Sequence, residues 1–282
     1  MALTDKLTSI ASEIRNKTGL SDDLTLDQMV IDVAASPSPL KDVPAYVVTE
    51  AERVAAAVGA LQNDNTLSFI AMSDTHIGNG DHDVSITHAA QAARIISGRV
   101  PIDFIAHLGD AVTGAAKETP ETHLGNHMNS LRALSIASPE LRLVGNHDAN
   151  AYEPTAYLSA EDTNKNIGRF TTKGTKPESE PERGYFYYDV SEKKTRVICL
   201  NSCDLKDLEV SAISDGHYIS AAQYSWLVSA LDMSGKTDWR LIVLSHHPVH
   251  WYGYMPKVLT LLDAYVAGLS GSITADGVSI AY

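Results

Sequence analysis

The chain has 282 residues, 44% of them hydrophobic and 20% charged, and its formal net charge is −13. This composition is typical of a globular protein with a sizeable core. The acidic balance argues against a nucleic-acid-binding protein, because phosphate contacts need a basic face. No apolar run approaches the roughly 20 residues of a membrane span.

The N-terminal residues 1–36 predict a small helical docking element. Apolar residues recur at helical spacing from Leu3 to Ile14, and Gly19 follows at a position typical of a helix end. Two short helices bury little surface alone, so we expect this element to pack on a partner or on another copy of the chain. The alternative is a plain helical appendage on the main domain. The start, Met-Ala-Leu-Thr-Asp-Lys, lacks the basic and apolar stretches of a signal peptide.

Residues 37–65 predict a proline-rich linker followed by a helix. Three prolines, Pro37, Pro39 and Pro44, favour extended backbone. An alanine-rich segment from Thr49 to Gln62 then carries one apolar face.

Residues 66–282 predict an α/β domain in which strands and helices alternate. Expected strands are 69–72, 102–108, 141–144 and 239–244, expected helices are 88–97, 122–137 and 220–231, and a hairpin is expected from 185–190 and 195–201. Such alternation indicates a largely parallel sheet covered by helices. The polar residues 149–183 are interpreted as a surface excursion over the strand ends. The only cysteines, Cys199 and Cys203, lie in or just after an apolar run and are predicted to be buried free thiols.

Four of the expected strands end in residues of metal-ligand type. These are Asp74 and His76, then Asp110, then Asn146, His147 and Asp148, and finally His246 and His247. The carboxyl ends of parallel strands share one edge of a sheet, so these side chains can converge. Mixed carboxylate, imidazole and amide ligands suit divalent metals of the Mn, Fe, Zn or Ni class. A carboxylate that bridges two such ions, roughly 3.5–4 Å apart, suits in-line phosphoryl displacement.

Each of these motifs alone is weak evidence. Gly-Asn-His occurs twice, and the copy at Gly125-Asn126-His127 lies in a helical pattern with no apolar run before it. We interpret that copy as a chance match outside the metal site, because a motif needs its structural context. The copy at residues 145–147 follows an apolar run and precedes Asp148. The ordered set of four strand ends is therefore the strong signal.

Together, Asp74-x-His76, Gly109-Asp110, residues 145–148 and His246-x-Pro248 resemble the calcineurin-like metallophosphoesterase family, over about residues 67–255. The resemblance implies a sandwich of mostly parallel sheets flanked by helices and two divalent metal ions. Asp74 and His76 would hold the first ion, Asp110 would bridge both, and Asn146 and His246 would hold the second. His147 would lie near a phosphate-ester substrate, and Asp148 would orient His147. The net negative charge does not oppose such a substrate, because bound divalent ions supply positive charge locally.

One departure from the family pattern follows His246. The family closes with a Gly-His-x-His stretch whose histidines complete both metal shells, and no such stretch is present here. The fold is therefore expected to be C-terminally incomplete. Three explanations compete: the polypeptide continues past Tyr282, the domain is degenerate and structural, or a partner supplies the ligands. We favour continuation, because Val278–Tyr282 resembles a strand cut short. No role is assigned to His247 or His250.

Residues 7–19 and 24–29 resemble a short helical repeat common at the starts of tailed-bacteriophage virion proteins. This resemblance implies a tail or baseplate protein that carries a phosphodiesterase, located in the virion and contacting other virion proteins, with cell-envelope phosphodiesters such as teichoic acid as the substrate. Two alternatives stand beside it. One is a structural virion protein whose non-catalytic domain binds surface glycopolymers. The other is a cytoplasmic nucleotide phosphodiesterase with an unrelated N-terminal extension.

Overall fold

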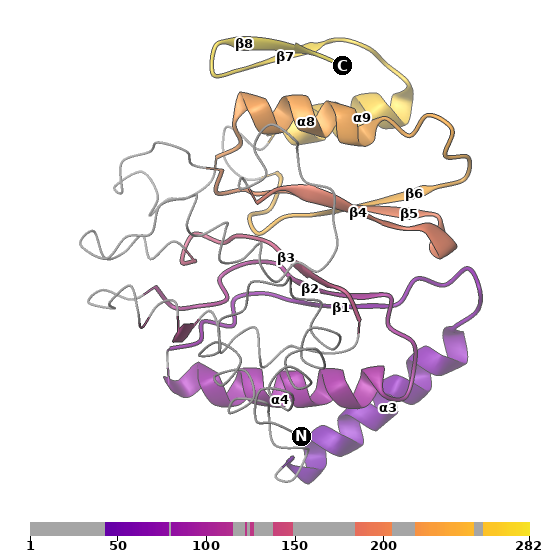
Figure 1. The fold of residues 1–282 in the computed structure, drawn as a ribbon, viewed down its shortest axis with the longest axis vertical. Coiled ribbons are helices and arrows are strands. Elements are labelled where there is room, and N and C mark those ends of the chain that lie inside the picture. Colours follow the sequence, from indigo (N-terminus) through magenta and orange to yellow (C-terminus); the bar gives the residue numbers. More distant parts are fainter. Residues whose placement is uncertain are drawn as a thin grey trace, which may run out of the picture.

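Two three-stranded sheets are stacked between two layers of helices in the computed structural model (Figure 1). The structure describes residues 43–78, 80–114, 122, 125–126, 138–148, 184–204, 218–250 and 256–282. The predicted docking element at 1–36, the excursion at 149–183 and most of the predicted helix 122–137 lie outside the described residues. Gly125 and Asn126, in the Gly-Asn-His copy at 125–127, are helical as predicted.

The first sheet is parallel throughout, with the strand order β1-β2-β3. Its strands are β1 (Phe69–Met72), β2 (Phe104–His107) and β3 (Glu140–Arg142). The central strand β2 is buried along its whole length, as expected for a parallel strand covered on both faces. The register pairs Met72 with His107, so the strands end level with one another.

The second sheet, β4-β5-β6, contains the predicted hairpin. Strand β4 (Phe186–Val190) pairs antiparallel with β5 (Thr195–Cys199) across the short 3-10 helix η1 (Ser191–Lys193). Strand β5 then pairs in parallel with β6 (Arg240–Leu244). Both cysteines are buried and free, which confirms the prediction for Cys199 and Cys203.

Helices α3 (Ala45–Leu61) and α4 (Gly80–Ser97) cover the outer face of the first sheet. Both begin earlier than predicted. The carbonyl of Pro44 accepts the N–H groups of Val47 and Val48, so α3 begins directly after the proline rather than at Thr49. Helix α4 begins at Gly80 instead of His88, and the expected start signals Ser85 and Thr87 lie inside it.

Helices α8 (Ala221–Leu231) and α9 (Pro256–Ala267) cover the second sheet. Ser220 caps α8 by accepting the backbone N–H of Gln223, as the capping-box pattern predicts. The Gln223 side chain does not complete a capping box. It forms hydrogen bonds with the backbone of Asn201 and the carboxylate of Asp204. A hairpin of β7 (Ser272–Ala275) and β8 (Val278–Ala281) packs outside these helices. The strand expected at the end of the sequence is thus present as β8.

Three apolar clusters hold these layers together. The cluster between the two sheets contains Phe104, Ala106, Leu141, Leu143, Phe186, Val190, Val197 and Cys199. A second cluster joins β5 to α8, α9 and the terminal hairpin, and a third joins β2 to α4. Burial on both faces of each sheet is the main source of stability in such a layered fold.

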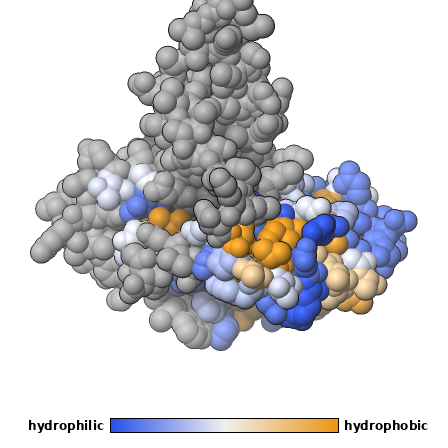
Figure 2. Space-filling view, turned by 90° about the horizontal axis from the view of Figure 1, so that it is seen from below, coloured by the Kyte–Doolittle hydropathy of each residue, from blue (hydrophilic) through white to orange (hydrophobic). Residues whose placement is uncertain are grey.

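The outer side formed by α3 and α4 mixes apolar and hydrophilic surface (Figure 2). On α3, Tyr46 and Leu61 are 61% and 74% exposed. Within the described ranges, no helix combines the length and the apolar character that crossing a bilayer requires.

Candidate metal centre

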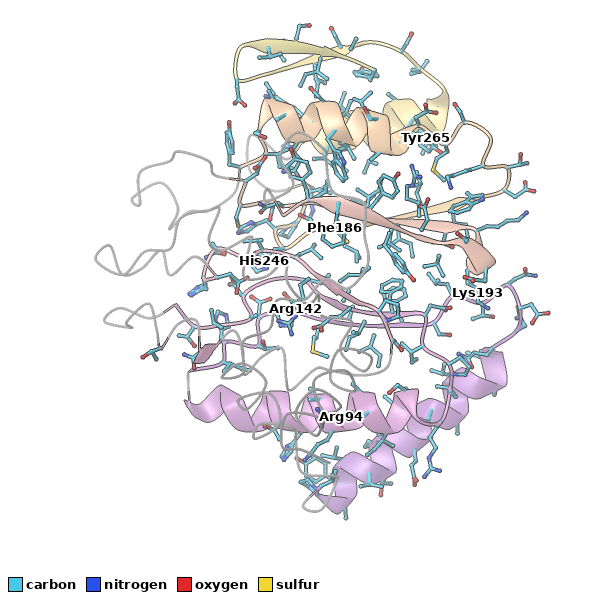
Figure 3. The ribbon with its side chains drawn as sticks, in the orientation of Figure 1. Arg94, Arg142, Phe186, Lys193, His246 and Tyr265 are labelled. Carbon is cyan, nitrogen blue, oxygen red and sulfur yellow. The ribbon has the colours of Figure 1, made fainter. Side chains whose placement is uncertain are left out.

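The loops that follow β1, β2, β3 and β6 meet at one edge of the sandwich, where Figure 3 labels His246. The pairing of β1 with β2 continues past both strand ends. The N–H of Asp74 donates to the carbonyl of Gly109, and that of His76 donates to the carbonyl of Asp110, each at 3.1 Å. The predicted convergence of the strand-end residues is therefore present in the structure.

Three of the predicted ligands have left-handed backbone conformations. The φ angles are 56° at Asp74, 46° at His76 and 53° at Asp110. For residues other than glycine such angles are uncommon and cost of order 1–3 kcal/mol each. The surrounding bonds hold these residues in conformations that the chain alone disfavours, which is typical of functional sites.

Two glycines allow the loops to approach closely. A Cβ atom at Gly145 would overlap the backbone nitrogen and the carboxylate of Asp110. Gly109 has a φ of 110°, and a Cβ atom there would lie 2.7 Å from the nitrogen of Gly145 and 2.9 Å from the ring of His246. Both positions therefore require glycine, and the Gly-Asp and Gly-Asn-His motifs are coupled through this contact.

Asp110 lies at the centre of the cluster. Its Oδ2 atom is 3.5 Å from Nε2 of His246, 3.8 Å from Nε2 of His76 and 3.9 Å from Nε2 of His147. The two longer separations exceed hydrogen-bond length. Two ligands on a shared tetrahedral ion would lie about 3.4 Å apart, given metal–ligand bonds near 2.1 Å. The spacing of these nitrogen and oxygen atoms fits a metal ion better than direct hydrogen bonds.

The remaining predicted ligands border the same carboxylate. Oδ1 of Asp74 lies 3.9 Å from Nε2 of His76. Oδ1 of Asn146 lies 3.2 Å from Nε2 of His246, the two atoms that the family resemblance assigns to the second ion. Within each of two groups of residues, the donor atoms all lie within 4.8 Å of one another. The groups are His76, Asp110 and His147, and Asp74, Asp110 and His246. Asp110 belongs to both groups, as a bridging ligand would, while the division of the other donors between two ions stays a prediction.

The charges of this cluster are coupled. Burial would raise the pKa of Asp110, but the His246 imidazole and the backbone N–H of His147 outweigh burial and hold that pKa below its usual range. Burial would lower the pKa of His246, but the carboxylate of Asp110, helped by Asp148 and Asp74, raises it above its usual value. A carboxylate that keeps its charge inside the protein is suited to hold a cation.

Hydrogen bonds of both its ring and its backbone hold His147 in place. Its Nδ1 atom lies 2.5 Å from the carbonyl oxygen of Thr113. A carbonyl oxygen only accepts, so Nδ1 carries the proton and Nε2, which faces Asp110, carries the lone pair. The backbone N–H of His147 also donates to Oδ1 of Asp110 at 2.9 Å. Nε2 of His147, predicted beside the substrate, therefore lies near Asp110, where it can either bind a metal ion or carry a proton, but not both at once.

Asp148 is fully buried beneath the cluster. Its carboxylate accepts the backbone N–H groups of Asp110, Ala111 and Gly145 at 2.7–3.0 Å. These bonds join the loop after β2 to the loop after β3. Asp148 thus has a contact set that the sequence did not indicate, and its predicted action on His147 stays a prediction.

The residues that support the centre from beneath were not predicted from the sequence. Thr75 and His107 contact each other, and the hydroxyl of Thr113 donates to the carbonyl of His76 at 2.8 Å. The sequence feature that could have pointed to His107 is its position at the end of a buried strand, three residues before Asp110. His247 has no predicted role, and its ring lies 4.6 Å from that of His246 with Nδ1 2.9 Å from the hydroxyl of Ser202.

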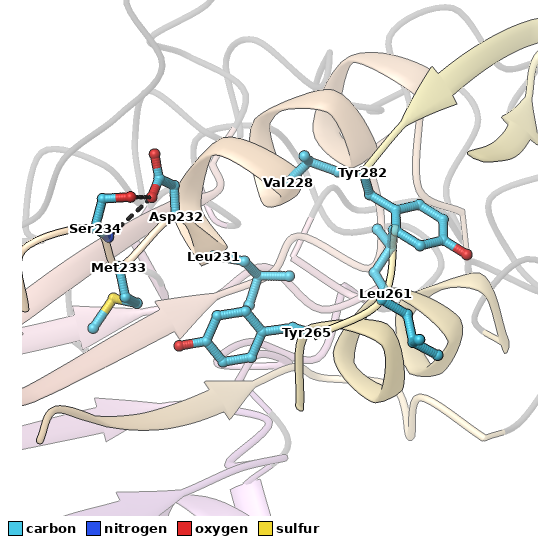
Figure 4. Close-up of a pocket in the computed structure, with 9 residues that line it drawn as sticks. Val228, Leu231, Asp232, Met233, Ser234, Leu261, Tyr265 and Tyr282 are labelled. Carbon is cyan, nitrogen blue, oxygen red and sulfur yellow. Dashed lines mark hydrogen bonds between the residues drawn. The ribbon is translucent and has the colours of Figure 1, made fainter. Parts of the chain in front are cut away.

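A pocket of about 400 Å³ lies away from this centre (Figure 4). It is lined mainly by apolar side chains of α8 and α9, including Leu231, Leu261 and Tyr265, together with Tyr282. Figure 3 labels Tyr265 on the helical layer and His246 at the sheet edge. None of the predicted site residues lines this pocket.

Comparison with known proteins identifies the architecture. No model of a protein family matches the sequence, and no curated protein matches it. Among solved structures, a dimetal phosphatase from Danio rerio is similar, with a TM-score of 0.54 at 12% identity over 76% of this chain and 86% of that chain. The chain has the fold of a dimetal phosphatase. The predicted α/β sandwich of sheets flanked by helices is therefore confirmed as the fold.

Proposed function

We propose that the chain is a metal-dependent phosphoric ester hydrolase with a dinuclear centre at the strand-end edge. The observation that carries the proposal is the environment of Asp110. Three imidazole Nε2 atoms, from three different loops, surround one oxygen of its carboxylate at 3.5–3.9 Å. The fold shared with a dimetal phosphatase supports the same conclusion.

In this proposal Asp74 and His76 would hold one ion, Asn146 and His246 would hold the other, and Asp110 would contribute to both. Divalent ions at such a site activate a water molecule and neutralise negative charge on the phosphoryl oxygens. The ions suited to this donor set are of the Mn, Fe, Zn or Ni class. The chain itself contributes positioned donors, three of them in left-handed backbone conformations, on loops that approach closely at Gly109 and Gly145.

His147 is the proposed proton carrier. The carbonyl of Thr113 fixes the proton on Nδ1, so Nε2 is the atom available to the site. A protonated Nε2 can donate to the ester oxygen as the leaving group departs, which is general acid catalysis. The side chain of His147 is 25% exposed, so a substrate can reach it.

We further propose a phosphodiester as the substrate. This step rests on the second resemblance, of residues 7–29 to tailed-bacteriophage virion proteins, which implies cell-envelope phosphodiesters such as teichoic acid. Those residues lie outside the described part of the chain, so virion location and contacts with other virion proteins stay predictions.

The test is metal content together with turnover. The chain is stripped with a chelator, reloaded with Mn²⁺, and assayed on an aryl phosphodiester and the matched monoester. We expect close to two equivalents of metal and faster hydrolysis of the diester. Asp110→Asn should abolish turnover and metal retention while the far-ultraviolet circular dichroism spectrum stays unchanged. The matched control is Asp263→Asn on the exposed side of α9. Unchanged turnover in Asp110→Asn would overturn the mechanism.

A structural role is the second candidate, and one observation favours it. Residues 247–282 contain no Gly-His-x-His stretch, so this part of the chain supplies fewer ligands than the family pattern. A protein that retains no transition metal and turns over neither ester would support a non-catalytic building block or a module that binds surface glycopolymers.

A further inference from the structure

Beneath the predicted ligands, two side chains link the first two site loops. The hydroxyl of Thr75 lies 2.9 Å from Nε2 of His107, at the end of β2. The same hydroxyl donates to the carbonyl of Ala111 at 3.2 Å. Nδ1 of His107 accepts the backbone N–H of Gly109 at 3.3 Å. The exposed fraction of His107 is 1%, so these bonds form away from bulk water.

The directions of these bonds determine the tautomer of His107. The N–H of Gly109 can only donate, so Nδ1 is unprotonated and Nε2 carries the hydrogen. Nε2 then donates to the Thr75 oxygen, which leaves the Thr75 hydroxyl proton for Ala111. The result is a continuous chain of hydrogen bonds (a relay) from Gly109 through His107 and Thr75 to Ala111. Both ends of this relay lie beside Asp110, in the loop after β2.

Thr75 stands between two predicted ligands of the first ion. Asp74 and His76 both have positive φ angles, of 56° and 46°. A three-residue turn with two such residues needs an anchor, because the chain alone disfavours it. Thr75 supplies a side-chain anchor for this turn through His107 and Ala111.

We infer that Thr75 and His107 are positioning residues that fix Asp74 and His76 relative to Asp110, and so set the affinity of the first metal ion. This inference rests on the proposed dinuclear centre. Groups that orient ligands typically change metal affinity by roughly 10–100-fold when they are removed. Asn146 and His246, the other proposed ligands of the second ion, lie on other loops, so the second ion should lose less affinity than the first.

The main test compares two substitutions of one residue. Thr75→Val keeps the branched shape and removes the hydroxyl, whereas Thr75→Ser keeps the hydroxyl. The full chain is stripped of metal and titrated with Mn²⁺ in a calorimeter. We expect Thr75→Val to weaken one of two binding events by about 10-fold or more, and Thr75→Ser to retain both. The control is Thr195→Val, which removes a fully buried hydroxyl on β5 that bonds the carbonyl of Lys193 at 2.9 Å.

A second pair of variants tests the coupling. His107→Leu removes both ring nitrogens at similar volume, and the double variant with Thr75→Val removes the whole relay. If the two residues act together, the double variant loses no more affinity than the more affected single variant. Full additivity would overturn the inference. The absorption spectrum of the Co²⁺-loaded protein should change in both single variants, because it reports ligand geometry.

The outcomes separate this inference from the proposed function. If the unsubstituted chain binds no metal, the proposed function fails and the inference fails with it. If the unsubstituted chain binds two ions and Thr75→Val binds them equally well, the inference alone fails. Equal weakening of both binding events, or a similar loss in Thr195→Val, would also overturn it, because that pattern indicates general loosening of the fold.

Discussion

The carboxylate of Asp148 accepts the backbone N–H of Asp110 at 3.0 Å, although 38 positions separate the two residues. The same carboxylate accepts the N–H groups of Ala111 and Gly145. One buried anion therefore satisfies three backbone donors of two loops. Unpaired buried donors are costly, so this arrangement determines how the loops close.

Replacing Asp148 with asparagine should destabilise the chain by about 2–3 kcal/mol, because hydrogen bonds to a charged acceptor are the stronger ones and the new amide group opposes a backbone donor. Urea unfolding of the metal-free chain measures the change. Asp263→Asn, at an exposed site on α9, should stay within about 0.5 kcal/mol of the unsubstituted chain. Equal stability of the two variants would contradict the assigned contacts.

The two Gly-Asn-His copies provide a matched pair of substitutions. Gly145→Ala places a methyl group against Asp110, so we expect a loss of roughly 1–3 kcal/mol from overpacking and loss of metal binding. Gly125 is helical and a Cβ atom there meets nothing within 4 Å, so Gly125→Ala should be stabilising by about 0.5–1 kcal/mol. Thermal unfolding with and without Mn²⁺ measures both effects. Similar behaviour of the two variants would show that the copy at 145–147 has no special environment.

The strand-end ligands could be predicted from the sequence because two simple rules located them. Apolar runs mark buried strands, and parallel strands end at a shared edge. Asp74, Asp110 and His246 each follow such a run, and the structure brings them together. The Gly-Asn-His copy at 125–127 could be set aside for the same reason, because no apolar run precedes it in the sequence.

The contacts beneath the ligands could not be predicted in the same way. The bonds of Asp148 depend on where the N–H groups of Asp110 and Gly145 point, and those directions follow from local backbone conformations, such as the positive φ angles at Gly109 and Asp110, that the sequence does not specify. His107 was assigned to a strand by its neighbours, and nothing in the sequence says that its ring meets Thr75. The start of α4 was missed because Ser85 and Thr87 are good capping residues that here lie inside the helix.

Both cysteine thiols should be inert while the chain is folded. Cys199 and Cys203 are buried, and burial raises the pKa of both thiols well above the usual range. Since the thiolate is the reactive form, labelling by an aromatic disulfide reagent near pH 8 should be negligible. Two thiols per chain should react after unfolding in urea. Rapid labelling of either cysteine in the folded chain would contradict the burial of that thiol.

The ion pair of Asp189 with Arg196 should make stability depend on acid pH. Two bonds of 2.8 and 3.0 Å join the groups, and the Arg196 side chain is 5% exposed. Burial would raise the pKa of Asp189, but Arg196 and Lys236 outweigh it and lower that pKa. A lowered carboxyl pKa means that the contribution is complete above the unfolded value of about 4 and is lost as the pH falls below it.

Asp189→Asn tests this dependence. Near neutral pH we expect a loss of about 2 kcal/mol, less than for a fully buried pair, because Asp189 is partly exposed. The difference from the unsubstituted chain should stay constant down to about pH 5 and shrink below about pH 4, where the aspartate takes up a proton. Urea unfolding across this range measures the difference, and Glu192→Gln in the exposed η1 segment is the control. A difference that grows toward acid pH would reverse the sign and rule out the charged pair as its source.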